Sequence, residues 1–284
     1  MKKIILFVSL CFISASCTND EETKVETTSD EKLITKVNFS LLINTFSFPK
    51  ENYLETYEYD EQKRLVRKNG GFIPMSGASG YAFYPTDILY KQITYLDNKV
   101  IVENFVDKTK DEFSATLRAP QFFYLNSKSQ IEYVEIPNKD NEDGSYPYFD
   151  KKEIYTYTNN KISERKITYP YMPSDHPEDY ILTYVEKYFY DSNENLIRTE
   201  FYEQHNGINE GYSAIQTFEN YDNSYNPFSK FIYLDEYFYR SLSKNNFRKY
   251  TKTEYKDGEI SGKTELIWDP TYDAKGNIIL YIEK

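Results

Sequence analysis

Cys17 is the residue of this sequence whose chemistry is easiest to name. It directly follows three small residues, Ser14, Ala15 and Ser16, at the end of a short apolar run. A cysteine at such a junction is expected to carry a lipid chain as a thioether and to become the new N-terminus once the preceding residues are removed. The alternative is a secreted protein that is cut near Ser16 and keeps Cys17 as a free thiol in an oxidising compartment.

The first sixteen residues have the organisation of an export signal. A basic start, Met1-Lys2-Lys3, is followed by an apolar run, residues 4–13, with about half the roughly 20 residues that a membrane-spanning helix needs. Residues 1–16 are therefore predicted to be a signal peptide that is removed. The junction Ser14-Ala15-Ser16-Cys17 resembles the bacterial lipobox. Cys11 leaves with the signal, so the mature chain keeps one cysteine and can form no internal disulfide.

Residues 17–32 are predicted to be the lipidated cysteine and an acidic, flexible tether. After Cys17 this stretch has no aromatic residue and a single aliphatic one, Val25, which is too little apolar surface to fold. A flexible coil of this length has an end-to-end distance of roughly 20 Å, enough to hold a domain clear of lipid headgroups. The run Asp20-Glu21-Glu22 resembles the export tags that send lipoproteins of some Gram-negative bacteria to the outer face of the outer membrane, and a merely solvated spacer is the alternative. The predicted location is the outer membrane, on its periplasmic or its cell-surface side, with the surface favoured.

The charge of the mature chain limits its partners. Without the signal, 32 basic residues face 45 acidic ones, a formal charge of −13. Such an acidic balance argues against nucleic acid and anionic lipid as partners, so membrane attachment is expected through the N-terminal lipid. Residues 33–284 contain no Pro-, Gly- or Ser-rich linker at mid-chain, which favours a single domain.

The body of the chain offers few groups for catalysis or metal binding. Its two histidines, His176 in a Pro-rich loop and His205 before Asn206-Gly207, are interpreted as exposed loop residues. One acylated cysteine and two histidines are too few for a Cys/His zinc site or for Cys–His catalysis. The sequence also lacks the Gly-x-Ser-x-Gly motif of serine hydrolases and a phosphate-binding glycine loop. No catalytic residue, metal ligand or cofactor is therefore predicted.

Acidic turns are the closest approach to a calcium site. Asn138–Gly144 brings several oxygens near a glycine, and Asp191–Asn195 has the alternate oxygen spacing of an EF-hand loop. Lys139 and Leu196 stand where such loops need an acidic residue and a glycine, so both segments are interpreted as ordinary turns. The 45 acidic residues leave a two-carboxylate glycosidase open, although no pair stands out.

Aromatic residues are the best candidates for ligand contacts. The chain has 30 tyrosines and 19 phenylalanines, and tyrosine suits a sheet with one partly solvated face. Two pairs, Tyr169 with Tyr171 and Tyr237 with Tyr239, are candidates for stacking on sugar rings. Packing in the core or on a sheet face is the alternative for all four.

A hairpin pattern recurs about every 33 residues and must position these side chains. In each copy alternating aromatics lead into a polar turn, and an aliphatic strand returns. The eight copies begin at Tyr57, Ile93, Phe123, Tyr155, Tyr188, Phe218, Tyr255 and Tyr272. Two short strands fill only about half of such a unit, so each unit should also hold a second strand pair or a long loop. Asp-Gly and Asn-Asn turns allow the positive φ that tight hairpins need.

These hairpins predict an all-β fold, an extended, twisted antiparallel meander that stays open or curls toward an open barrel. Residues 70–80, rich in Gly and Ser, are expected to form a flexible loop. No apolar stripe with helical spacing is sustained over three turns, so helices are not predicted. Charged residues interrupt nearly every strand, which argues against a transmembrane barrel with a lipid-facing apolar band.

The Tyr-Asp hairpins resemble YD/Rhs-type repeats. More specifically, the runs Tyr221-Asp222-Asn223, Asn226-Pro227-Phe228, Leu242–Asn246 and Tyr272–Ile278 resemble the C-terminal half of a group of uncharacterised Gram-negative cell-envelope lipoproteins. The resemblance covers residues 185–284. It implies an all-β fold and a lipoprotein location, and it implies no activity, because none is established for that group.

The anchor, the tether, the aromatic excess and the lack of a catalytic motif favour a non-enzymatic binding or scaffold module for a polysaccharide or another envelope protein. A carbohydrate-active hydrolase with an unidentified carboxylate pair is the first alternative. A carrier whose curved sheet shelters a lipid or an apolar peptide is the second, and it would need an apolar concave pocket.

Overall fold

The computed structural model describes most of one compact unit, Leu33–Lys284. The described residues are 33–38, 54–77, 80–109, 119–137, 150–169 and 182–281, and the side chains of 72–86 are not among the described groups. Cys17, Tyr171, His176 and Asn138–Gly144 lie outside the described residues. No helix in the described part of the chain has the length and apolar character of a membrane span.

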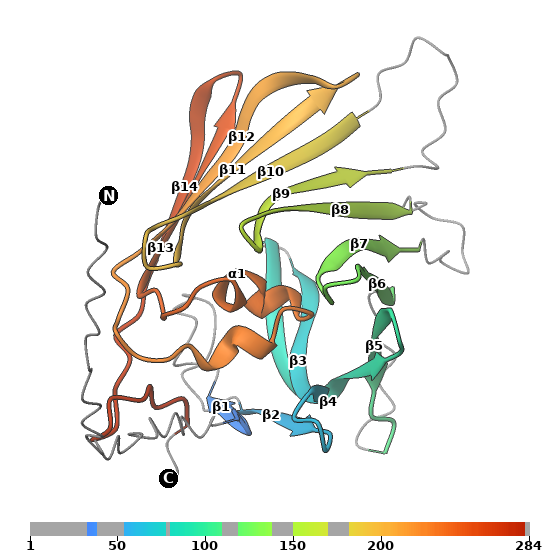
Figure 1. Cartoon of the computed structure of the whole chain (residues 1–284), viewed down its shortest axis with the longest axis vertical. Coiled ribbons are helices and arrows are strands. Elements are labelled where there is room, and N and C mark those ends of the chain that lie inside the picture. Colours follow the sequence, from blue (N-terminus) through green and yellow to red (C-terminus); the bar gives the residue numbers. More distant parts are fainter. Residues whose placement is uncertain are drawn as a thin grey trace, which may run out of the picture. The chain divides into compact units, whose positions relative to one another are not determined.

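The described strands form one open antiparallel sheet in which every strand pairs with its neighbours in sequence (Figure 1). The strands are β1 (Lys36–Asn38), β2 (Leu54–Tyr59), β3 (Leu65–Gly77), β4 (Gly80–Tyr95), β5 (Lys99–Val106), β6 (Gln121–Leu125), β7 (Ile131–Ile136), β8 (Lys151–Thr158), β9 (Lys161–Thr168), β10 (Leu182–Tyr190), β11 (Leu196–His205), β12 (Ile208–Glu219), β13 (Lys249–Lys256) and β14 (Glu259–Ile267). The predicted all-β antiparallel meander is therefore confirmed.

Four turns share one five-residue geometry that starts with Asp or Asn. They are Asp60–Arg64, Asn126–Gln130, Asp191–Asn195 and Asp273–Asn277, and in each the first residue exchanges backbone hydrogen bonds with the fourth and fifth. The carboxylate or amide oxygen of the first residue accepts further backbone N–H groups, as at Asp191, which accepts from the fifth residue at 2.9 Å. The fourth residue is in the left-handed region: Lys63, Ser129, Glu194 and Gly276. Short polar side chains stabilise such turns locally, which is why the sequence reveals them.

Three other turns are tight two-residue connections. Asn159-Asn160, Asn206-Gly207 and Asp257-Gly258 each have positive φ at both positions. This is the backbone conformation that matches the twist of a hairpin, and Asn, Asp and Gly adopt it at low cost. The expected role of Asn-Asn and Asp-Gly in tight hairpins is confirmed.

The expected loop at residues 70–80 is wrong. Residues 70–77 and Gly80 extend β3 and β4 into long strands, and the pairing runs from Gly71 with Thr86 to Gly77 with Gly80. A register shift follows Asn69, where Gly70 has φ of 97°. The glycine thus provides an irregularity inside a strand, and pairing with the neighbour outweighs the loop-like composition.

A second difference concerns the hairpin expected from Phe218 to Phe228. Strand β12 ends at Glu219, and the chain then forms two 3-10 helices, η2 (Pro227–Lys230) and η3 (Asp235–Tyr237), followed by the short helix α1 (Phe238–Ser241). Asn226 begins this helical segment, residues 227–242, because its side chain accepts the backbone N–H of Phe228 at 3.0 Å. Backbone hydrogen bonds of 2.9 Å then join residues three apart, from Phe231 to Phe228, from Leu234 to Phe231 and from Tyr237 to Leu234.

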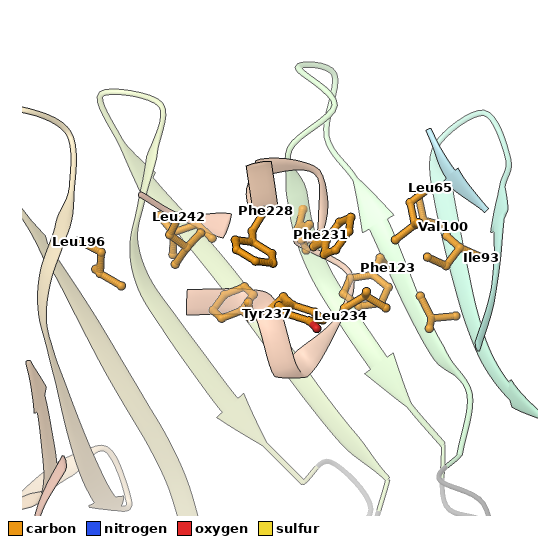
Figure 2. Packing of buried hydrophobic residues seen from close by; sticks show 14 of the residues in the cluster. Leu65, Ile93, Val100, Phe123, Leu196, Phe228, Phe231, Leu234, Tyr237 and Leu242 are labelled. Carbon is orange, nitrogen blue, oxygen red and sulfur yellow. The ribbon is translucent and has the colours of Figure 1, made fainter. Parts of the chain in front are cut away.

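The helical segment supplies the centre of the hydrophobic core (Figure 2). Phe228, Phe231 and Leu234 have no exposed surface. The same cluster includes Val37 of β1 and Phe218 of β12, so the sheet must curve around the segment to reach it from both ends. Burial of each large apolar side chain stabilises the fold by about 1.5–3 kcal/mol. The face of the sheet that packs on the segment is called the inner face below.

Candidate functional site

Three rows of side chains cross the inner face of the sheet. The row nearest the turns contains Tyr59, Tyr95, Leu125, Tyr157, Tyr190 and Tyr221, and the next contains Tyr57, Ile93, Phe123, Tyr155, Tyr188 and Phe218. The third row contains Glu55, Lys91, Gln121, Glu153, Glu186 and Gln216. Within the strands, alternation puts these residues on one face, because successive side chains point to opposite faces. Tyr221 lies two residues beyond the end of β12 and joins the first row through its contact with Leu196. The inner face is thus hydrophobic near the turns and charged beyond them.

The first row links successive hairpins through tyrosine hydroxyls. Four of these hydroxyls donate to a backbone carbonyl, which either begins the returning strand of the preceding hairpin or belongs to Ile34 before β1. The pairs are Tyr59 to Ile34 at 2.7 Å, Tyr95 to Leu65 at 3.0 Å, Tyr157 to Ile131 at 2.9 Å and Tyr221 to Leu196 at 2.5 Å. Burial raises the pKa of Tyr157 to about 12, so the hydroxyl keeps its proton for donation. These bonds explain why a tyrosine precedes four of the turns, whereas Leu125 has the matching position before the Asn126 turn.

Tyr190 interrupts the tyrosine row. Its hydroxyl oxygen is buried and has no hydrogen-bond partner in the described part of the chain. Burial raises the pKa of Tyr190 well above its usual value, so the group remains a neutral donor. Buried hydroxyls are normally hydrogen-bonded, and an unpartnered one requires an explanation.

A pocket of about 250 Å³ lies beside Tyr190, and we call it the turn-edge pocket. It lies between the turn ends of β7 to β10 and the helical segment. Tyr157, Tyr190 and Tyr233 contribute aromatic surface, and Gln130, Asn160 and Lys161 contribute polar groups. Its lining includes no Asp or Glu. Lys161 is the one charged residue of the lining, and it lies 3.9 Å from Glu194, which is outside the pocket. The remaining aromatic faces and amide groups suit an uncharged polar ligand, while the carboxylate pair that a glycosidase needs is not part of this pocket.

The third row forms a buried ion network with the helical segment. Lys68 of β3 lies 2.6 Å from Glu55 and 2.5 Å from Glu236, which also contacts Lys91 at 2.8 Å. Burial alone would raise the pKa of Glu236, but Lys68 and Lys91 outweigh it and lower that pKa far below its usual value. Tyr237 and Tyr57 both lie within hydrogen-bonding distance of Glu55, at 2.5 and 2.6 Å. This network fastens η3 to β2 and β3.

A second ion network lies further along the sheet. Arg165 of β9 contacts Glu153 at 3.3 Å and Glu186 at 2.7 Å, and both carboxylates are almost fully buried. The hydroxyls of Tyr155 and Tyr188 donate to the glutamate two residues before each of them. Burial alone would raise the pKa of Glu153, but Arg165 and Lys151 outweigh it and lower that pKa. The two carboxylates are therefore neutralised structural groups.

The structure places three of the four predicted stacking tyrosines. Tyr169 is half-buried and lies edge-on to Tyr184, with ring centroids 6.4 Å apart. Tyr237 is 2% exposed in the core, so it presents no open face to a ligand. Tyr239 is partly buried, packs on Phe218 and donates to Glu186 at 2.8 Å. The helical segment holds Tyr237 and Tyr239 against the inner face. For these two residues the structure thus supports packing in the core or on a sheet face.

His205 lies at the end of β11. Its ring nitrogens are 3.1 Å from Glu203 and 3.3 Å from Glu210, on either side of the tight turn. No group of three metal-ligating side chains occurs among the described residues. The histidine thus contacts a carboxylate on each strand of one hairpin.

Imperfect alternation in the sequence suggests aromatic residues on both faces of the sheet, but the residues of the opposite, outer face were not predicted. The ring of Tyr90 stacks on Phe105 at 5.1 Å with Arg67 above it, and Tyr124 stacks on Tyr133 at 4.4 Å. All five side chains are half-buried. Strand alternation is only a partial signal for them. Phe105 and Tyr124 have the opposite parity from the buried residues of their strands. Register shifts give Arg67 and Tyr133 the same parity as the buried residues Leu65 and Ile131, so alternation alone does not identify them.

Comparisons with known proteins provide information on the fold. Neither a protein-family model nor a curated protein matches the sequence. The solved structure of a porin-like protein from Bacteroides vulgatus is similar, with a TM-score of 0.50 and 12% identity over 87% of this chain and 90% of that chain. A porin-like protein from Bacteroides uniformis gives a TM-score of 0.42 and 10% identity over 79% and 80% of the two chains. At this level of identity, the first likeness supports the all-β fold alone.

Proposed function

We propose that the protein is a lipid-anchored module of the cell envelope that binds an uncharged stretch of polysaccharide at the turn-edge pocket, without catalysing a reaction. The composition of that pocket is the observation that supports this class of ligand. Tyrosine rings adjoin amide groups there, and the buried hydroxyl of Tyr190 has no partner among the described residues. A sugar ring offers apolar C–H faces to the tyrosines and hydroxyls to the polar groups.

The envelope location rests on Cys17 and the segments around it. The signal before Cys17 and the acidic tether after it are the features of a lipid-anchored exported protein. Labelling cells with a fatty acid tests this part, because wild type should take up label and Cys17→Ala should not. Label that persists in Cys17→Ala contradicts acylation at that residue.

The other functions considered are supported less well. A hydrolase would need two carboxylates in an open cleft, whereas Glu153 and Glu186 are buried and paired with Arg165. A carrier would need an apolar concave pocket, and the helical segment occupies the inner face with Phe228, Phe231 and Leu234. Because these side chains fill the inner face, a ligand is more readily bound near the turns, where the turn-edge pocket lies.

Binding of neutral glycans to the mature chain tests the proposal. Asn160 lines the turn-edge pocket in a left-handed conformation with φ of 62°, so Asn160→Gly removes the amide and keeps the turn. Asn206→Gly is the matched control, because Asn206 has φ of 53° in the β11–β12 turn, which does not line the pocket. Loss of one ligand hydrogen bond should weaken binding by about tenfold in the first variant only. Absence of glycan binding, or equal effects of the two variants, contradicts the proposal.

A further inference from the structure

A second, smaller pocket lies near the C-terminal end of the described chain, and we call it the Arg240 pocket. Its volume is about 80 Å³, and it is lined by Arg240, Asn246, Phe247 and Trp268, by the exposed acidic residue Asp269, and by residues 270, 271 and 278–280. A single water needs only about 10–15 Å³ of such space. The pocket therefore has room for a small organic molecule.

Arg240 brings a buried positive charge to this pocket. Its side chain lies against aromatic rings, 4.1 Å from the centroid of Phe247 and 4.6 Å from that of Trp268. Within the described residues, no carboxylate oxygen lies within 4.0 Å of the guanidinium, and its one hydrogen bond runs to the carbonyl of Phe247 at 3.3 Å. Burial lowers the pKa of Arg240 to about 10. A charge in this setting is stabilised by a desolvated anion that pairs with it.

Asp222 is an acidic group near Arg240, but its oxygens are already engaged. One oxygen accepts the backbone N–H groups of Ser224 and Asn246, at 3.2 and 3.0 Å. The other accepts the hydroxyls of Ser224 and Tyr272, at 2.7 and 2.8 Å. Asp222 thus organises the surrounding loops, and the guanidinium edge on the pocket remains available.

Two further polar atoms at the pocket are buried without a partner in the described structure. They are the indole nitrogen Nε1 of Trp268, a donor, and the amide oxygen Oδ1 of Asn246, an acceptor. The amide nitrogen of Asn246 is fixed by contacts to Asp222 and Ser224, so the oxygen must point away from them. Buried polar atoms without partners are uncommon, and two of them around one cavity indicate a ligand that supplies both an acceptor and a donor.

We propose that the Arg240 pocket binds a small hydroxycarboxylate. The carboxylate accepts hydrogen bonds from the guanidinium and from the indole N–H of Trp268, and its hydroxyl donates to Asn246 Oδ1. The carbon atoms lie against the apolar residues Ile279 and Leu280. A phosphate dianion fits less well, because one guanidinium and one indole cannot neutralise two charges among apolar walls.

Trp268 provides a direct probe, since it is the single tryptophan of the chain. Its fluorescence, excited where tyrosine does not absorb, should change saturably when the mature protein is titrated with lactate. Propionate lacks only the hydroxyl and should bind about threefold to tenfold more weakly, because one hydrogen bond is lost. Inorganic phosphate and chloride at equal ionic strength should give no saturable change. A missing lactate response, or equal responses to all four anions, overturns the proposal.

Two variants assign the response to this pocket. Arg240→Gln removes the charge and should abolish lactate binding. Because Arg240 is buried and this variant can fail to fold, Ile279→Phe provides a second test that keeps the arginine and fills the cavity. Its matched control is Ile260→Phe, at a position on β14 that is 66% exposed. Lactate binding that survives in folded Ile279→Phe overturns the assignment. Glycan binding that depends on Asn160 should be unchanged in Ile279→Phe, so the two proposals can fail separately.

Discussion

The hydroxyl of Tyr237 donates to Glu55 at 2.5 Å, although the two residues are 182 positions apart. Glu55 belongs to the second strand of the sheet and Tyr237 to η3, so this bond joins the beginning of the sheet to the helical segment. The hydroxyl of Tyr57 lies 2.9 Å from that of Tyr237 and shares the same carboxylate. A residue that looked like a surface stacking group is thus part of the interior closure of the fold.

Lys68→Met should strongly destabilise the protein. Lys68 is 2.6 Å from Glu55, and both side chains are almost completely buried, so the substitution leaves a buried carboxylate without its cation. Removal of one partner of a buried ion pair costs about 3–5 kcal/mol in the free energy of unfolding, which urea denaturation measures.

The matched control is Lys252→Met on β13. Lys252 lies at the same 2.6 Å from Glu254, but the two side chains are 37% and 48% exposed. An exposed pair contributes below about 1 kcal/mol. Similar losses of unfolding free energy in the two variants would show that burial does not determine how much the Lys68 ion pair contributes to stability.

Tyr95→Phe tests the tyrosine row. The substitution removes the hydroxyl that donates to the carbonyl of Leu65 at 3.0 Å and leaves that carbonyl without this donor. The expected loss is about 1–3 kcal/mol in the free energy of unfolding. Tyr124→Phe is the control, because that ring stacks on Tyr133 and its hydroxyl makes no hydrogen bond within the described structure. If Tyr95→Phe is as stable as the control, the tyrosine row does not stabilise the fold through these hydroxyl bonds.

Acid should weaken the protein through Glu236. Lys68 and Lys91 hold the folded-state pKa of Glu236 far below the unfolded value of about 4.3. A lowered folded pKa contributes stability above pH of about 4.3 and loses it progressively as the pH falls toward the folded pKa. Glu236→Gln should therefore lose less stability than wild type between about pH 5 and pH 3, measured by urea unfolding at each pH. Parallel curves for the two proteins would exclude Glu236 as a source of acid sensitivity.

Asp191→Ala tests the shared five-residue turn. The carboxylate accepts the backbone N–H groups of Asn193 and Asn195, both at 2.9 Å, and the substitution removes both bonds. The expected loss is about 1 kcal/mol in the free energy of unfolding, since the turn is partly solvated. Asn193→Ala changes the exposed middle of the same turn and should stay within about 0.5 kcal/mol of wild type. Equal stability of the two variants would contradict this role of the Asp191 carboxylate.

The sequence predicts the turns well because their chemistry is local. Asp60, Asp191 and Asp273 bond to backbone groups no more than four residues away, so each turn is encoded next to where it forms. The strands that flank them follow from alternation. Their antiparallel order follows directly where neighbours are joined by short turns, whereas β12 and β13 pair across residues 220–248, which contain the helical segment.

The helical segment was missed because its apolar spacing is three, not the 3.6 of an α-helix. Phe228, Phe231, Leu234 and Tyr237 are each three residues apart, which is the repeat of a 3-10 helix. A search for that period, starting after the capping pair Asn226-Pro227, is the signal that could have found it. Its neighbours on the sheet come from strands far away in sequence, and only the structure identifies them.

The two pockets could not be derived from the sequence for the same reason. The turn-edge pocket forms where Tyr157 and Tyr190 of the sheet lie next to Tyr233 of the helical segment. The Arg240 pocket forms where Trp268 meets Arg240 and Leu280. Each pocket depends on how elements far apart in the sequence are positioned in the fold, and no local sequence pattern predicts that position.

The position of the helical segment late in the chain sets an order of folding. Strands β1 to β12 precede it, and their hairpins can form as soon as each turn emerges, because neighbouring strands pair locally. Their inner face stays uncovered until Phe228, Phe231 and Leu234 arrive. A chain that stops before Phe228 would therefore hold paired strands with an exposed apolar face, a species prone to aggregate or to be held by chaperones. The last fifth of the polypeptide thus decides whether the first four fifths become a stable protein.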